Sequence, residues 1–141
     1  FSEAGLEEFG PAWLTKAFHT AGTMSKTNKV TRIIFQKKKV ELKAGNNAGK
    51  FFFEVRYAQK TADLHEKLFA KIPFQCLGDF KSDRIGASVY KQPMEFMELN
   101  TFRLLESSLP FEIPRYYFCD ISPETSNYIL ITHQIAFAEL N

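Results

Sequence analysis

Residues 51–57, Phe51-Phe-Phe-Glu-Val-Arg-Tyr57, carry the clearest secondary-structure signal of the chain. Positions 51, 53, 55 and 57 are aromatic or β-branched, whereas positions 54 and 56 are charged. Successive side chains of a β-strand point to opposite faces of the sheet, so this alternation predicts a strand with one face toward a core. The fold is therefore expected to be organised around a sheet.

Four other segments have the β-branched and aromatic composition of strands. They are residues 30–42, 66–74, 116–121 and 128–135. The small residues at 44–49, Ala-Gly-Asn-Asn-Ala-Gly, can adopt the backbone angles of a turn. We expect this turn to join the first of these strands to the 51–57 strand in a hairpin.

Two segments have helical patterns. Pro11 suits the first turn of a helix, and Gly22 suits the position after the last turn. Between them, apolar residues recur at helical spacing and would share one face of the helix. They are Trp13, Leu14, Ala17, Phe18 and Ala21. A second helix is expected over residues 93–109, between two prolines that mark its ends.

These elements predict an α+β fold with a twisted, five-stranded antiparallel sheet. The 93–109 helix would pack on this sheet, and the N-terminal helix would be appended to it. Residues 1–27 would form a helical extension and residues 28–141 a single small lobe. The total length of 141 residues suits one domain with its own core.

The composition, with 45% hydrophobic and 24% charged residues, is typical of a soluble globular protein. No apolar run approaches the roughly 18 residues that cross a bilayer, so the chain is not expected to be transmembrane. Cys76 and Cys119 are isolated, which leaves open two buried thiols or one disulfide. The histidines show no ligand spacing, so no metal site is predicted. Phe1 in place of Met fits either a processed terminus or the boundary of an excised segment, and it leaves the compartment open between the cytoplasm and an organelle interior after removal of a leader.

The net charge of +2 is unevenly distributed. Residues 26–60 contain ten lysines and arginines but two acids, Glu41 and Glu54, which gives this segment a charge of +8. Such a segment could attract phosphates or dock onto an acidic surface of a partner protein or a membrane, or its lysines could keep an exposed sheet edge soluble. Nucleic acid is not expected as a ligand, because the alternation of the phenylalanines already accounts for the aromatic side chains.

The second helix places a carboxylate on its apolar side. Phe102, Leu105 and Leu109 repeat at helical spacing and define the expected buried face, and Glu98 lies one turn before Phe102 on that face. Glu95 lies one turn earlier still. A buried carboxylate needs a cationic partner, for which a lysine or arginine of the sheet is the natural choice. Alternatively, both glutamates complement the positive end of the helix dipole, which explains Glu95 better than Glu98.

Lys71 is the candidate partner on the sheet. A lysine in a strand usually points to solvent, but Phe69 shares the face of Lys71, so that face is partly apolar. A strand lysine paired with an inward glutamate of the next helix is the ion pair with which kinase-type domains hold nucleotide phosphates. Upstream, the glycine turn could let backbone amides approach phosphate oxygens.

In this order, the motifs resemble the small, N-terminal lobe of the aminoglycoside phosphotransferase and choline-kinase-like branch of the protein-kinase-like fold. The resemblance spans about residues 28–137 and rests on the following segments: Gly45-Asn-Asn-Ala-Gly49, Leu68-Phe-Ala-Lys-Ile-Pro73, Glu98, Phe102-Arg-Leu-Leu, Leu109-Pro-Phe-Glu-Ile-Pro-Arg-Tyr-Tyr-Phe118 and Tyr128-Ile-Leu-Ile-Thr-His-Gln-Ile135.

The resemblance implies a nucleotide site, with ATP as the possible cofactor. Lys71 would contact the α- and β-phosphates, and Glu98 would orient it. The turn formed by Gly45, Asn46, Asn47, Ala48 and Gly49 would cover the phosphates. Residues 131–135, with Ile131 and His133 among them, would form the hinge strand that meets the adenine. Relatives tend to carry a glutamate where this chain has His133, which leaves the adenine-side contacts open.

Such enzymes carry their catalytic aspartate and metal-binding residues in a second lobe beyond the hinge, and this sequence ends six residues after Ile135. No catalytic residue or metal ligand is therefore predicted. We expect a non-catalytic accessory or scaffold protein, in which a kinase-like small lobe serves as a binding module of a larger assembly. The alternative is the N-terminal part of an ATP- and magnesium-dependent phosphotransferase that acts on a small molecule.

Overall fold

The computed structural model describes residues 1–35, 48–73 and 89–136. Within these ranges the chain forms a five-stranded antiparallel sheet with the strand order β1-β2-β3-β5-β4. The strands are β1 (Val30–Phe35), β2 (Ala48–Tyr57), β3 (Lys67–Pro73), β4 (Tyr116–Ile121) and β5 (Tyr128–His133). The α+β fold class and the five-stranded antiparallel sheet are confirmed.

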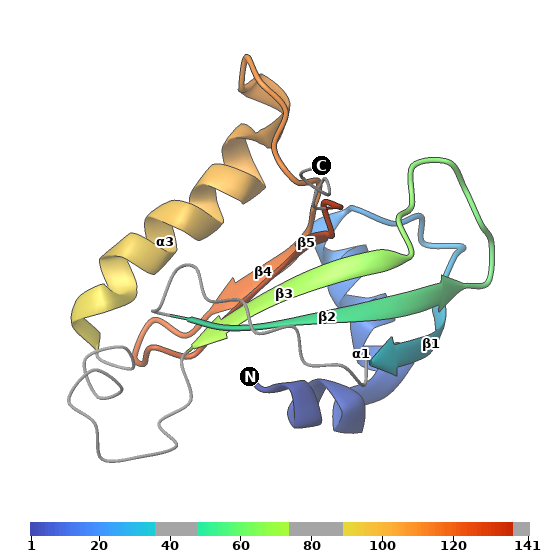
Figure 1. The fold of residues 1–141 in the computed structure, drawn as a ribbon, viewed down its shortest axis with the longest axis horizontal. Coiled ribbons are helices and arrows are strands. Elements are labelled where there is room, and N and C mark those ends of the chain that lie inside the picture. The colour runs from blue at the N-terminus through green and yellow to red at the C-terminus, as the bar shows by residue number, and fades with distance from the viewer. Residues whose placement is uncertain (36–47, 74–88, 137–141) are drawn as a thin grey trace, which may run out of the picture.

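Helices lie on both sides of this sheet (Figure 1). The first is α1 (Glu3–Ala21). The second begins with the 3₁₀ turn η1 (Val89–Lys91) and continues as α3 (Gln92–Asn100). It then ends through the π-helical turn η2 (Thr101–Leu105) and the 3₁₀ turn η3 (Glu106–Ser108). In Figure 1, α3 runs beside β4 while α1 lies behind the sheet.

The larger core lies between α1 and one face of the sheet. Phe53 and Val55 of β2 are fully buried, as their alternation predicts, and Leu68 and Ala70 of β3 join them. From the helix, this core takes Leu6, Leu14, Ala17 and Phe18. The N-terminal helix thus supplies part of the main core.

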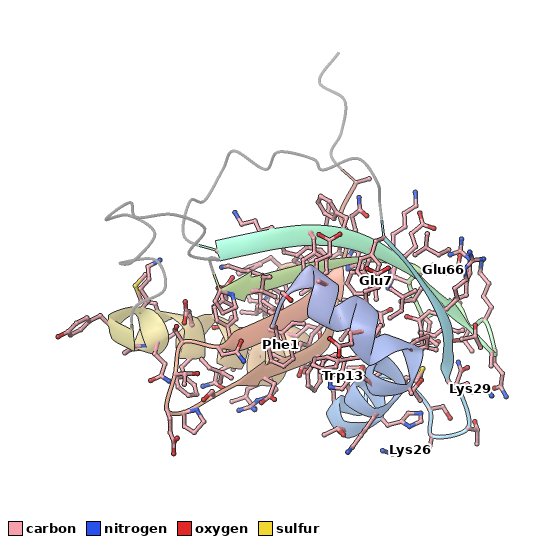
Figure 2. All side chains as sticks on the ribbon, turned by 90° about the horizontal axis from the view of Figure 1, so that it is seen from below. Phe1, Glu7, Trp13, Lys26, Lys29 and Glu66 are labelled. Carbon is pink, nitrogen blue, oxygen red and sulfur yellow. The ribbon has the colours of Figure 1, made fainter. Side chains whose placement is uncertain are left out.

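Aromatic contacts also join the start of the chain to the sheet. Figure 2 shows Phe1 and Trp13 between α1 and the strands. The ring centroid of Trp13 lies 5.7 Å from that of Phe1 and 5.5 Å from that of Phe118 on β4, the latter in an edge-to-face arrangement. Edge-to-face pairs add to the stabilisation from apolar burial, so Trp13 anchors α1 to the far strand.

The ends of α1 follow the rules for helix caps. The Ser2 hydroxyl accepts a hydrogen bond from the Gly5 N–H at 2.9 Å, and Gly22 ends the helix at φ 72°. The predicted end at Gly22 is confirmed, but the predicted start at Pro11 is wrong. A kink at Gly10, where φ is 69°, divides the helix, and Pro11 opens the second part rather than the whole.

A smaller core lies between α3 and the opposite face of the sheet. It consists of Leu99, Tyr116, Cys119, Tyr128 and Leu130, with Phe102 partly buried against it. The predicted buried face of the helix is correct for Phe102 and wrong for Leu105, whose side chain is 48% exposed. The π-helical turn η2 explains the difference, because Leu105 lies at its end, where the wider turn has departed from the α-helical period on which the predicted face rests.

Several sequence predictions lie at or beyond the limits of the described ranges. The strands predicted over 30–42 and 66–74 reach residues outside them, as does Cys76. Cys119 is a buried free thiol. No helix within the described ranges has both the length and the apolar character to cross a bilayer.

The β2 core position provides a first test. We expect Phe53→Ala to lower the free energy of unfolding by about 3–5 kcal/mol, because it removes a ring that is fully buried against α1 and leaves a cavity. Phe111→Ala, which truncates a ring that is 63% exposed, should change it by less than about 1 kcal/mol. Urea denaturation of the unmodified protein and of the two variants measures both changes. Equal losses of unfolding free energy in the two variants would contradict the assignment of Phe53 to the core.

Candidate functional site

A cavity of about 400 Å³ lies where the beginning of β2, the end of β3 and the beginning of β5 meet the helix α3. Its lining combines three lysines with two glutamates and one tyrosine. The residues are Ala48, Lys50, Lys71, Lys91, Met94, Glu95, Glu98 and Tyr128. This concentration of charge in a partly enclosed space makes the cavity the candidate site.

An ion pair between β3 and α3 crosses the cavity. Lys71 Nζ lies 2.5 Å from Glu98 Oε2, and the side chains are 24% and 35% exposed. The carboxylate that the helical pattern directs toward the sheet therefore meets the lysine of the third strand. Partial exposure limits what such a pair adds to stability, to about 1 kcal/mol or less. Its main effect is to fix the direction of the lysine side chain.

Lys50 is a third charged member of the site that the sequence analysis missed. It stands directly opposite Lys71 in the ladder between β2 and β3. Burial lowers the pKa of Lys50, the positive charge of Lys71 lowers it further, and Glu98 opposes these effects. The alternation along β2 places Lys50 on the same face as Phe52, and this could be read from the sequence. That Lys50 lies beside Lys71 could be found only from the register of β2 and β3.

Glu95 is the most deeply buried charged group of the cavity. Its residue is 7% exposed, and its Oε2 has no hydrogen-bond partner among the residues that the structure describes. Burial raises the pKa of Glu95, and Glu98 raises it further, whereas Lys91 and Lys71 oppose the increase. From the sequence, the position of Glu95 could be explained by a favourable interaction with the positive end of the helix dipole. In the structure, its side chain lies toward the core instead. Leu99, one turn later and 2% exposed, marks the same face.

Tyr128 completes the cavity from β5. Its side chain is buried. Burial also raises the pKa of its hydroxyl, with Glu95 and Glu98 as further causes. The tyrosine is thus a neutral hydrogen-bonding group at neutral pH.

Two members of the predicted phosphate-covering turn can be placed. Ala48 lines the cavity, and Gly49 follows it on β2. A Cβ on Gly49 would lie 3.0 Å from Ile72 Cγ1 and 3.2 Å from the Pro73 carbonyl oxygen, so glycine permits the close approach of β3. Gly45, Asn46 and Asn47 lie outside the described residues.

The two predicted hinge residues do not line this cavity. Ile131 is fully buried in the middle of β5. His133, at the end of that strand, stacks on His65 with ring centroids 4.5 Å apart, and its Nδ1 accepts a hydrogen bond from the Arg115 N–H at 2.7 Å. Their role in adenine binding stays a prediction.

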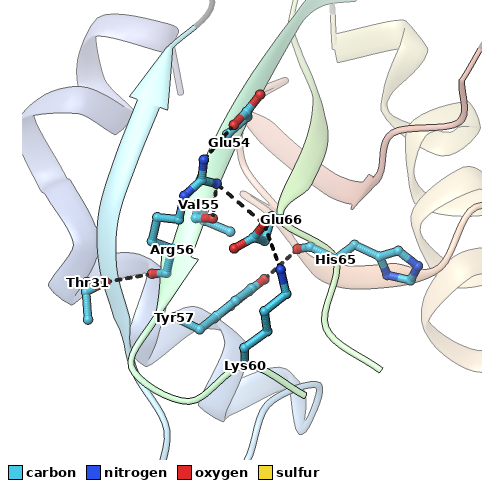
Figure 3. Close-up of polar contacts among 8 residues, drawn as sticks. All are labelled: Thr31, Glu54, Val55, Arg56, Tyr57, Lys60, His65 and Glu66. Atoms are coloured by element: carbon cyan, nitrogen blue, oxygen red, sulfur yellow. Dashed lines mark hydrogen bonds and ion pairs between the residues drawn. The ribbon is translucent and has the colours of Figure 1, made fainter. Parts of the chain in front are cut away.

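The basic segment is partly neutralised by its own neighbours. Arg56 contacts Glu54 at 3.1 Å and Glu66 at 3.8 Å, and Lys60 contacts the same Glu66 at 3.4 Å (Figure 3). At the loop between α1 and β1, Lys26 and Lys29 extend from the surface (Figure 2). Four other lysines of the segment lie outside the described residues. Docking of residues 26–60 onto an acidic partner stays a prediction.

Comparison with protein-family models, with curated proteins and with solved structures gives no match. The resemblance to a kinase-like lobe therefore rests on the residues quoted from the sequence. Among the residues that the structure describes, His, Cys, Asp and Glu side chains do not gather in groups of three or more that could hold a metal ion.

His133 predicts a pH dependence of stability. Its pKa is lowered, first by burial of the ring and then by His65 and Arg115, against an opposing effect of Glu106. The folded chain thus binds this proton less readily than the unfolded chain. The stabilisation is complete above the ordinary pKa of histidine and is lost as the pH falls through that value and toward the lowered one.

We expect the free energy of unfolding to fall between about pH 7 and about pH 5 by roughly 0.5–1 kcal/mol from this site, because protonation of Nδ1 removes the hydrogen bond from Arg115. His133→Gln should flatten this part of the curve. Denaturant titrations at several pH values measure the slopes, and a slope unchanged in His133→Gln would refute the assignment.

Proposed function

We propose that this chain is the nucleotide-facing lobe of an ATP-dependent phosphotransferase for a small molecule, and that its cavity binds the phosphates of the nucleotide. The observation that carries the proposal is the ion pair between Lys71 and Glu98. A lysine held by a helix carboxylate presents a directed positive charge, which is what the recognition of phosphate oxygens requires.

The surroundings of the ion pair support an anionic ligand. Lys50 and Lys91 line the same cavity. Two lysines directly opposite each other, as Lys50 and Lys71 are, repel one another by up to about 1 kcal/mol. A phosphate group between them would be attracted by both, because its oxygens accept hydrogen bonds from ammonium groups.

In phosphoryl transfer, this lobe would position the nucleotide and stabilise its negative charge. Glu98 would orient Lys71, and Lys71 would bind the phosphate oxygens throughout the reaction. The base and the metal ions that such a reaction uses would come from another part of the protein.

A second candidate function is a binding module in a larger assembly, and the exposed side chains of α3 and of the turns before and after it favour it. Large apolar side chains are exposed there, with Met97 at 72% and Leu104 at 63%. The set, which we call the apolar stripe, consists of Tyr90, Met94, Met97, Leu104, Leu105 and Phe111. Exposed apolar groups concentrated in one segment are typical of protein interfaces.

Nucleotide binding provides the test of the first function. We expect Lys71→Met to weaken the binding of ATP at least tenfold, because a charge-assisted hydrogen bond contributes about 1.5–3 kcal/mol. Lys67→Met removes an exposed lysine from the other end of the same strand and should leave the dissociation constant unchanged. Isothermal titration calorimetry distinguishes the variants, and equal affinities would make Lys71 an ordinary strand lysine.

The apolar stripe provides the test of the second function. We expect Met97→Lys to release proteins that the unmodified chain retains from an extract of its source cells, because a lysine cannot remain in an apolar contact. Phe9→Lys alters a residue on α1 that is 50% exposed and should retain them. Quantitative mass spectrometry compares the three samples. Identical sets of retained proteins would argue against an interface at the stripe.

A further inference from the structure

Glu95 has no role in the ion pair, and yet it is the more buried of the two glutamates in the cavity. It is 7% exposed, and its Oε2 is shielded from solvent without a hydrogen-bond partner in the described ranges. A shielded oxygen without a donor destabilises a carboxylate much more than a neutral carboxyl group. The geometry therefore favours the protonated form of Glu95.

The groups around Glu95 come from every element that borders the cavity. They are Lys50 on β2, Lys71 on β3, Lys91 on η1, Glu98 on α3 and Tyr128 on β5. Among the described residues that line the cavity, ionisation of Glu95 adds one negative charge beside the lysines, and its protonation removes that charge. The protonation state of this single group thus changes the attraction of the cavity for an anion.

We propose that Glu95 is a proton-controlled specificity residue of the cavity, which admits phosphate groups in its neutral form and disfavours them when ionised. This inference rests on the proposed phosphate-binding function of the same cavity. Ionised Glu95 acts in two ways: it repels phosphate oxygens directly, and it offers Lys71 a second carboxylate in competition with the ligand.

A proton fits this position better than a metal ion does. A hard divalent cation takes about six oxygen ligands. The cavity offers two carboxylates, one of which is already paired with Lys71, and an oxygen of the other is shielded. Burial raises the pKa of Glu95 and Glu98 raises it further, whereas Lys91 and Lys71 oppose the increase. Linkage requires the converse as well: a bound phosphate group raises that pKa further.

The probe for the test is inorganic tripolyphosphate, titrated calorimetrically from about pH 4, near the ordinary pKa of glutamate, to about pH 8, without metal ions and then with Mg²⁺. The measured quantity is the dissociation constant of the unmodified protein divided by that of Glu95→Gln. This ratio cancels the titration of the probe itself. We expect it to rise about tenfold with pH, because one charge is added beside the ligand in the unmodified protein only. Glu124→Gln, an exposed acid in the β4–β5 turn, is the matched control and should behave as the unmodified protein does.

The outcomes separate the two proposals. A ratio that stays constant with pH, while tripolyphosphate still binds through Lys71, overturns the role of Glu95 and leaves the phosphate site intact. No binding by the unmodified protein at any pH overturns the proposed function itself. A ratio that depends on Mg²⁺ rather than on pH also overturns the proposed control by a proton. It would show that Glu95 binds a cation instead.

Should Glu95→Gln fail to fold, the carboxyl carbon of Glu95 can be titrated by NMR in the unmodified protein. A midpoint that rises when tripolyphosphate is added supports the proposal, and a midpoint that does not move refutes it.

Discussion

Two lysines placed side by side on adjacent strands are the constraint on which the arrangement of the candidate site depends. Lys50 and Lys71 face each other across the β2–β3 ladder, on the sheet face that α1 does not cover. Without a negative group, their repulsion would oppose the pairing of these strands. Glu98 supplies that group from α3, which crosses this face within reach of Lys71. The apolar contacts of α3 seat it on the sheet, and the ion pair adds a small stabilisation there.

The two cores meet at β4. The side chains of Tyr116 and Tyr117 point to opposite faces, as successive residues of a strand do, and both are buried, the first in the core beneath α3 and the second in the core beneath α1. The register of the pairing with β5 shifts between Tyr116 and Phe118, and Phe118 packs against the core beneath α1 together with Tyr117. The Tyr117 hydroxyl also accepts a hydrogen bond from the backbone N–H of His65, at 2.6 Å. One strand therefore connects the layers on both sides of the sheet.

The sequence predicts the sheet well because each strand has a period of two or a compact apolar run. The bounds of β4 agree with the prediction, and those of β5 differ at one end, where His133 turns to its contact with Arg115. The kink at Gly10 and the π-helical turn were not predictable from periodicity, because each changes the period from which the faces are inferred.

For the candidate site, the limits of prediction are different. Glu98 and Lys71 could be paired from sequence, because one violates an apolar pattern and the other lies on the strand before it. Lys50 could not be added without the register that sets it opposite Lys71. Glu95 was visible, but its burial depends on how closely α3 approaches the sheet, which is a property of tertiary packing.

The π-helical turn has a consequence for how this chain can vary in length. In a regular α-helix, the loss of one residue rotates everything that follows by about 100°. A π-helical turn already holds one residue more than an α-helical turn. A deletion within Thr101–Leu105 could therefore restore regular helix and leave α3 in place on the sheet. Relatives of this protein can accordingly be expected to differ by one residue here, with the Lys71–Glu98 contact unchanged.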